Sequence, residues 1–189
     1  NANDCSNGKP IDIRINADNN SVVFSHNGSC FTYENLVDLI TQISTKIKDE
    51  EKIGKFGTGF ISTHLISEGV EIQGLYHKSK ESQEYKKLNL ILDRSGVTAD
   101  EISEEITKAI EVVESLESSP NVRCDDEITT SFIYRFNNNR DVQEAISKGF
   151  LDWERTIPFV LAFSDNIRSV RFNDIEVKKE YVVKDGKIC

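Results

Sequence analysis

The chain has 189 residues, of which 38% are hydrophobic and 29% charged, a composition typical of one ordinary globular domain with its own core. No stretch approaches the roughly 20 consecutive apolar residues needed to span a bilayer, which argues against a membrane protein. The formal net charge of −9 argues against broad electrostatic attraction to nucleic acid or to an anionic membrane, because both partners require a clustered cationic surface.

The cysteine pattern indicates neither a metal ribbon nor a disulfide framework. Cys5, Cys30, Cys124 and Cys189 are scattered and form no CxxC pair. We therefore expect a cytoplasmic protein. The sequence contains no methionine and opens without a signal-peptide pattern, so we expect it to begin partway along a longer protein.

The first part of the chain predicts a β-hairpin, a helix and a glycine-rich segment. Residues 11–15 alternate apolar and polar side chains and, after a polar turn, residues 21–28 form the second strand of the hairpin. Thr32 is expected to cap a helix that extends to about Ile47, because apolar residues recur at helical spacing. After a charged linker comes the segment EKIGKFGTGF, residues 51–60.

The rest of the chain predicts alternating strands and helices. These elements are a short helix at 61–67, strands at 70–78 and 85–94, an amphipathic helix capped by Asp100 and ending near Ser118, a strand at 128–136, a helix from about Arg140 to Thr156, a short helix starting at Pro158, and closing strands within 169–188. The turn between the last strands lies at Asn173 and Asp174 or at Asp185 and Gly186.

The glycine-rich segment raises the question of a phosphate loop. Gly54, Gly57 and Gly59 lie within six positions, although each glycine inside a regular element costs about 1 kcal/mol relative to alanine. The pattern GxxGxG fits neither a Walker loop nor a dinucleotide-binding loop, but a helix start just behind it would favour an anion. Taken alone, the segment leaves a phosphate loop and a structural turn equally open.

Three short motifs in a fixed order carry a family resemblance. GKFGTGF (residues 54–60) resembles the second glycine box of the GHKL ATPases, especially of the ninety-kilodalton heat-shock chaperones and the sacsin-like branch. NANDC (residues 1–5) looks like the tail of the N-box of that superfamily, and FSHNGSCFT (residues 24–32) occupies the place of its Asp-x-Gly-x-Gly adenine box. TTSFIYRF and the segment at 151–172 resemble later parts of the same domain.

The resemblance implies the Bergerat ATP-binding fold, an α/β (α+β) two-layer sandwich with helices on one face of a mixed, mainly antiparallel sheet. We expect one such domain over residues 1–189, with residues 173–189 as a C-terminal hairpin or the start of the next domain. The implied cofactors are ATP and Mg²⁺, with Asn1 as the metal ligand. The implied nucleotide contacts are Asn1, Asp4, His26, Asn27, Gly28, Lys46, Gly54, Lys55, Phe56, Gly57, Thr58, Gly59, Phe60 and Thr130.

His26 is the main departure from the family pattern. The family has an aspartate there, which accepts a hydrogen bond from the adenine amino group, whereas a neutral imidazole accepts through only one nitrogen. Asp4, Asn27 and Gly28 are expected to share base recognition, or Asn27 replaces the aspartate with its amide oxygen. Thr130 resembles the family threonine that supports adenine, with Thr129 as the register-shifted alternative.

Each implied contact also has a purely structural interpretation. Asn1 can be a capping residue at a frayed terminus, Asp4 an exposed carboxylate and His26 a packed residue at a strand end. Lys46 and Lys55 can be solvated, and the phenylalanines at 56 and 60 are expected to pack and hold the loop rather than to stack on a base.

The resemblance implies a nucleotide-driven conformational switch within a larger chaperone-like, defence or repair ATPase. Its partners would be the nucleotide, the other domains of the same protein and, as an open expectation, a second copy of the chain. The family's catalytic glutamate would lie four residues before Asn1, so we expect slow hydrolysis or none from this chain. The alternative function is a non-catalytic interaction module with a degenerate nucleotide pocket.

Overall fold

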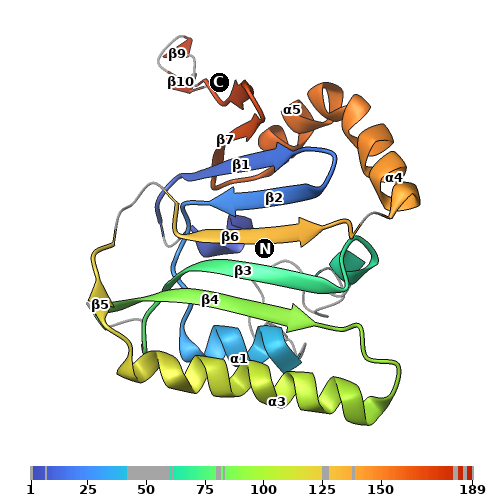
Figure 1. Cartoon of the computed structure of the whole chain (residues 1–189). Coiled ribbons are helices and arrows are strands. Elements are labelled where there is room, and N and C mark those ends of the chain that lie inside the picture. Colours follow the sequence, from blue (N-terminus) through green and yellow to red (C-terminus); the bar gives the residue numbers. More distant parts are fainter. Residues whose placement is uncertain are drawn as a thin grey trace.

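The computed structural model describes residues 2–6, 8–41, 60, 62–79, 82, 84–124, 128–137, 139–180, 183–184 and 187–188. Within them, one large sheet carries helices on one of its faces (Figure 1). This architecture confirms the predicted fold class, a two-layer α/β sandwich with a mixed, mainly antiparallel sheet.

The large sheet consists of β1 (Ile11–Ala17), β2 (Ser21–His26), β3 (Gly69–Tyr76), β4 (Tyr85–Asp93), β5 (Asn121–Val122), β6 (Thr130–Arg135), β7 (Ile167–Phe172) and β8 (Ile175–Lys178). Its order is β5-β4-β3-β6-β2-β1-β7-β8, and its pairs are antiparallel except for the parallel pair of β1 with β7. The helices are α1 (Tyr33–Thr41), α3 (Ala99–Ser115), α4 (Arg140–Leu151), α5 (Trp153–Phe163) and the short 3₁₀ helices η1 (Ala2–Cys5), η3 (Ser62–Leu65) and η4 (Leu116–Ser118). None of the helices in the described ranges is long and apolar enough to cross a membrane.

The register of the strands gathers the apolar side chains on one face. Ile15, Phe24, Phe132, Ile72 and Leu90 are successive cross-strand partners, so they form one row across five strands. Because neighbouring residues of a strand point to opposite faces, the alternation seen in the sequence places one set of residues in the core and leaves the other set on the open face. The helices cover the face that carries this row.

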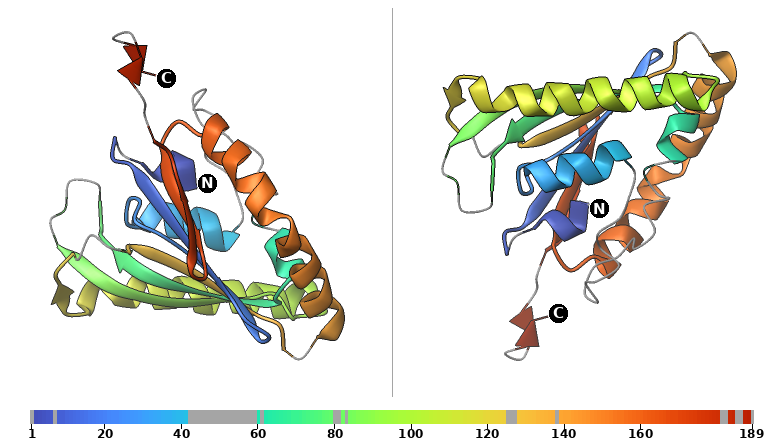
Figure 2. Two further views of the ribbon diagram at one scale, coloured as in Figure 1. Left: turned by 90° about the horizontal axis from the view of Figure 1, so that it is seen from above. Right: turned by 90° about the horizontal axis from the view of Figure 1, so that it is seen from below.

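The helices cover the core face from two sides. Ala109 and Val113 of α3 are buried against β4 and α1. At the other end of the sheet, the rings of Phe150 and Trp153 contact Phe172, with centroids 4.6 and 5.0 Å away. Figure 2 shows α1 and η1 lying between α3 and α5, so the middle of the core face lies beneath η1 and α1.

The start of α3 differs from the prediction. The predicted cap, Asp100, is wrong, because Thr98 caps the helix: its hydroxyl accepts a hydrogen bond from the Glu101 N–H at 3.3 Å. The Glu101 carboxylate in turn accepts from the Thr98 N–H at 3.0 Å. This reciprocal capping box satisfies two N–H groups at once, which a cap at Asp100 would leave unpaired.

The boundary between the two helices after residue 140 differs from the prediction. The predicted helix to Thr156 ends instead at Leu151, and α5 begins at Trp153 and contains Pro158 in its interior. Asp152, with φ −102° and ψ 8°, separates the two helices. The turn at Asp152 redirects the chain so that residues on both sides of it reach the same aromatic partner on β7.

The closing strands contain two hairpins. β7 and β8 are joined at Asn173 and Asp174, where Asn173 adopts a positive φ of 47°, as tight hairpin turns require. β9 (Val183–Lys184) and β10 (Lys187–Ile188) form a separate two-stranded sheet. Asp185 and Gly186, the alternative turn, lie outside the described residues.

Truncating an isoleucine should destabilise the protein far more on the core face of the sheet than on its open face. Ile72→Ala removes a side chain with 0% exposure and is expected to lower the free energy of unfolding by about 2–5 kcal/mol. Ile91→Ala, at a side chain with 61% exposure, is the matched control and should change it by less than about 0.5 kcal/mol. Urea denaturation of both variants measures the difference, and equal losses would contradict the one-sided core.

Candidate functional site

A second row of cross-strand partners interrupts the apolar face. Ile13, His26, Thr130, Gly74 and Leu88 follow one another across β1, β2, β6, β3 and β4, directly beside the apolar row described above. The two outer members are buried aliphatic residues, whereas the three central ones are two polar side chains and a glycine. We define His26, Thr130 and Gly74 as the polar step, and this step is the candidate site.

His26 is held in one tautomer by its own loop. The side chain is 4% exposed, and its Nδ1 accepts a hydrogen bond from the Gly28 N–H at 3.1 Å. Burial lowers the pKa of His26 from 6.5 to about 4, so the ring is neutral at pH 7. Because Nδ1 uses its lone pair to accept, the single ring proton lies on Nε2, which can only donate.

The two neighbouring threonines have different environments. The hydroxyl of Thr129 donates to the carbonyl oxygen of Gly28, and the Thr129 N–H donates to the carbonyl oxygen of His26 at 3.1 Å. Thr130, in contrast, is 1% exposed and its hydroxyl has no hydrogen-bond partner among the described residues. Thr129 therefore fixes the loop, and Thr130 presents a free polar group on the core face.

Gly74 allows β3 to approach the start of β6. A Cβ atom at this position would lie 2.3 Å from the carbonyl oxygen of Thr129, a backbone atom that cannot move aside without moving the strand. The Leu75 N–H donates to the same carbonyl at 3.0 Å. The absence of a side chain at Gly74 therefore brings β3 close to the backbone beside Thr130.

The loop after β2 contacts the N-terminal 3₁₀ helix. The backbone N–H and the hydroxyl of Ser29 donate to the carbonyl oxygen of Cys5 at 2.8 and 3.0 Å. A Cβ atom on Gly28 would lie 2.9 Å from the Cys5 Cβ, so this close packing depends on glycine. The structure thus brings η1, which includes Asp4, to the loop that follows His26.

Phe60, the last residue of the glycine-rich segment, is packed onto the core face. Its ring lies 5.8 Å from Phe132 and 5.8 Å from His64, measured between centroids. Phe132 also contacts the rings of Phe24 and Phe31 at 6.5 and 6.2 Å. The end of the glycine-rich segment therefore packs against Phe132, which lies two residues after Thr130 on β6.

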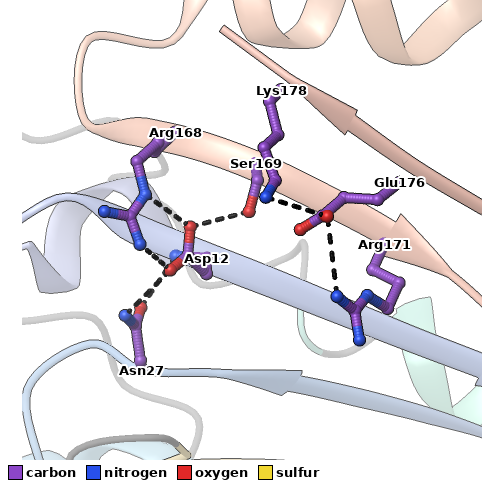
Figure 3. Close-up of polar contacts among 7 residues, drawn as sticks. All are labelled: Asp12, Asn27, Arg168, Ser169, Arg171, Glu176 and Lys178. Carbon is purple, nitrogen blue, oxygen red and sulfur yellow. Dashed lines mark hydrogen bonds and ion pairs between the residues drawn. The ribbon is translucent and has the colours of Figure 1, made fainter.

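The side chain of Asn27 points toward Asp12, within a polar cluster (Figure 3). Its Oδ1 accepts from the Asp12 N–H at 2.7 Å, and its Nδ2 lies 3.5 Å from the Asp12 carboxylate. The Asp12 carboxylate also accepts from Arg168 Nε at 2.9 Å and from the Ser169 hydroxyl at 2.6 Å. Because Asp12 alternates with the buried side chains of β1, this cluster lies on the open face of the sheet.

The electrostatics of this cluster favour ionised Asp12. Burial alone would raise its pKa, but the hydrogen bonds from Arg168 and Ser169 and the charges of Arg168 and Lys178 outweigh burial and lower the pKa of Asp12. Nearby on the same face, Glu176 accepts from Lys178 at 3.0 Å and lies 3.5 Å from Arg171 (Figure 3). With its amide held at Asp12, Asn27 is not available as the base acceptor considered from the sequence.

Several residues proposed from the sequence lie outside the described residues. These are Asn1, Lys46, Gly54, Lys55, Phe56, Gly57, Thr58 and Gly59. Of the proposed contacts, the structure therefore places His26, Gly28 and Thr130 together, with Asp4 on the adjacent η1. Within the described ranges, no group of three or more His, Cys, Asp or Glu residues could hold a metal ion.

Sequence reasoning missed two features of the site. The role of Gly74 could have been predicted, because a single glycine inside an otherwise apolar strand often indicates that another backbone approaches closely. The pairing of Asp12 with Arg168 could not have been predicted from a local pattern, because the two residues are separated by 156 positions and meet through the parallel pair of β1 with β7.

Comparison with known proteins gives a distant relation. No family model matches the chain. The chain is similar to the chaperone protein HtpG of Rhodococcus jostii (strain RHA1), with 25% identity over 173 residues. The match covers 78% of this chain but 25% of that protein, so the chain spans about a quarter of the length of its relative. This likeness supports a distant chaperone-like relation.

A methyl group at Gly74 should disrupt the polar step. Gly74→Ala is expected to lower the free energy of unfolding by about 1–3 kcal/mol, because the new Cβ would overlap the Thr129 carbonyl oxygen. Gly149→Ala, where the added Cβ meets nothing within 4 Å in α4, is the matched control and should stabilise the protein by about 0.5–1 kcal/mol. Urea denaturation of both variants measures the two changes. Stabilisation by both would contradict the close approach of Gly74 to the Thr129 carbonyl oxygen.

The buried imidazole of His26 should titrate far below its usual range. An NMR titration is expected to show one imidazole signal with a midpoint near pH 4, and the His26→Gln variant identifies it by its loss. The unfolded chain binds this proton at about pH 6.5, so the free energy of unfolding falls as the pH drops from 6.5 to 4, by at most about 3 kcal/mol from this group. A midpoint near 6.5 would contradict the buried, neutral ring.

Proposed function

We propose that this chain is the nucleotide-binding domain of a larger GHKL-type ATPase, in which ATP with Mg²⁺ drives a conformational switch. The larger protein would be chaperone-like or would act in defence or repair. The observation that carries this proposal is the free hydroxyl of Thr130 on the core face, beside His26. The distant likeness to a chaperone protein supports the same assignment.

An unpartnered buried hydroxyl is costly without a ligand. Leaving such a group unsatisfied costs about 1–3 kcal/mol, and native proteins retain few of them. A flat heterocyclic base carries polar atoms along its edge, and such an edge can pair with Thr130 and with Nε2 of His26 at the same time. Phe60 and Phe132 add apolar surface next to these two groups. The residues present therefore fit a nucleobase.

The triphosphate would extend from this base site toward the glycine-rich segment. Asn1 would hold Mg²⁺, and Lys46, Lys55 and the glycine box at 54–59 would contact phosphates; these roles rest on the family resemblance. The packing of Phe60 supports them, because it fixes one end of the segment on the core face near Thr130. The bound ion would neutralise the phosphate charge in this acidic chain.

An interaction module with a degenerate pocket is the second candidate. It is favoured by exposed apolar side chains on the α4–α5 pair, where Leu151, Phe159 and Phe163 are 80%, 66% and 87% exposed. Large apolar side chains gathered on a surface are typical of contact sites for other proteins. This candidate predicts a folded chain that binds no nucleotide.

Replacing Thr130 separates a ligand-binding role from a structural one. Thr130→Val removes the unpartnered hydroxyl with little change in shape, so it should leave the free energy of unfolding unchanged or raise it. The same change should weaken ATP binding, measured by calorimetry with Mg²⁺, by roughly fivefold or more. Thr130→Ser keeps a hydroxyl and is the matched control, which should bind ATP much like the original chain.

The phosphate loop is tested in parallel. Gly57→Asp places a negative charge in the glycine box and should abolish binding of ATP, of ADP and of a non-hydrolysable ATP analogue, whereas Gly149→Asp on α4 should not. Absence of binding to the unaltered chain, or undiminished binding to Thr130→Val, would reject the assignment of the polar step as the base site.

A further inference from the structure

The outer edge of β8 has no partner strand in the described part of the chain. β8 is the last strand of the large sheet and pairs with β7 on one side. Ile175, Glu176 and Lys178 of this strand are exposed. Because an edge strand presents N–H and C=O groups to solvent, it can add a strand from another molecule.

The pairing of β8 with β7 determines which backbone groups point outward. The turn between the two strands has two residues, so Phe172 and Ile175 beside it exchange backbone hydrogen bonds. Such positions alternate along an antiparallel pair, and in step with this the Lys179 N–H donates to a carbonyl oxygen at the start of β7 at 2.9 Å. Glu176 and Lys178 therefore direct their N–H and C=O groups away from β7.

The two outward residues carry opposite charges. The carboxylate of Glu176 and Nζ of Lys178 lie 3.0 Å apart on the open face of the sheet (Figure 3). If two β8 strands met with Glu176 opposite Glu176, or with Lys178 opposite Lys178, like charges would face each other, which destabilises a cross-strand pair. The alignment centred on Val177 instead places Glu176 of each copy opposite Lys178 of the other.

From this charge pattern we propose that two copies of the chain associate by antiparallel pairing of their β8 strands, about a two-fold axis at Val177. Glu176 of each copy then exchanges backbone hydrogen bonds with Lys178 of the other. The two large sheets become one continuous sheet, and the helices of both copies lie on the same side of it. This association does not depend on the nucleotide site.

The core face adds apolar contact along the same edge. Ile175 is 50% exposed, and in this alignment it lies opposite Lys179 of the second copy. The Nζ of Lys179 donates to the carbonyl oxygen of Ser164, the residue that follows α5. Ile175 of each copy therefore comes close to the end of α5 of the other copy, where Phe163 is 87% exposed. Burial of these side chains from water favours the dimer.

Analytical ultracentrifugation of the full chain tests the association. The unaltered chain is expected to form a weak dimer, with a dissociation constant of about 100 μM or lower, because the paired edge is short. Glu176→Lys and Lys178→Glu each put like charges opposite each other and should weaken the homodimer at least about fivefold. A mixture of the two variants restores opposite charges at both positions and should form a heterodimer about as tight as the original dimer.

The matched controls for the charge changes are Glu144→Lys and Lys148→Glu. These residues form an ion pair of 2.7 Å on α4, away from the β8 edge, so reversing either charge should leave the association unchanged. Melting curves show that each variant remains folded.

The apolar contact is tested with a second pair of variants. Ile175→Ser should weaken the dimer, whereas Ile91→Ser, at a 61% exposed side chain on β4, is the matched control and should not. A monomeric unaltered chain at about 1 mM, equal effects of the control changes, or a mixture of charge variants that fails to associate would overturn the β8 dimer. Each of these results would leave the proposed nucleotide site intact, because calorimetry with ATP tests that site separately.

Discussion

The hydrogen bond from the Gly28 N–H to His26 Nδ1 is the constraint on which the candidate site depends. It keeps a neutral imidazole on a face that is mostly apolar, where a charged ring would be strongly disfavoured. It also requires the loop to turn back immediately after β2, and only glycine fits at position 28, because Cys5 packs against it. The tautomer of the ring and the close packing of η1 on this loop therefore both depend on Gly28.

The polar step lies where three central strands, β2, β6 and β3, are held close together. Thr129 ties the start of β6 to the loop after β2, and Gly74 lets β3 approach the same backbone. The apolar row beside the step, centred on Phe132, then supplies the packing energy that holds the strands together. The packing of the neighbouring row offsets the cost of the one unsatisfied polar group here, the hydroxyl of Thr130.

Much of the fold could be predicted from the sequence, because side-chain alternation and helical spacing are local properties. The strands, the stripe of α3 and the hairpin turn at Asn173 all follow from such patterns. The capping box at Thr98 is equally local, since Thr-x-x-Glu is its signature, but the prediction places the cap at an aspartate two residues later. The predicted helix start at Pro158 was wrong for a similar reason. Proline is common at helix starts, but some helices, such as α5, contain one in their interior.

The site was less accessible to sequence reasoning than the fold. Family resemblance indicated His26 and Thr130, but their pairing is a matter of strand register, which depends on tertiary contacts. The amide oxygen of Asn27 accepts a hydrogen bond from the Asp12 N–H, instead of being free for a base. No short motif predicts this contact, which joins the two sides of the hairpin.

The parallel pair of β1 with β7 has a consequence for how the chain acquires its structure during synthesis. β1 is made before its second neighbour, β7, and the ion pair of Asp12 with Arg168 joins residues that lie 156 positions apart. Until those residues leave the ribosome, β1 has an unpaired edge, and the small core around Ile11, Leu161 and Val170 does not exist. The sheet can therefore grow outward from β2, β6, β3 and β4, but its pairing is completed last at β1, the strand of this sheet that comes first in the chain.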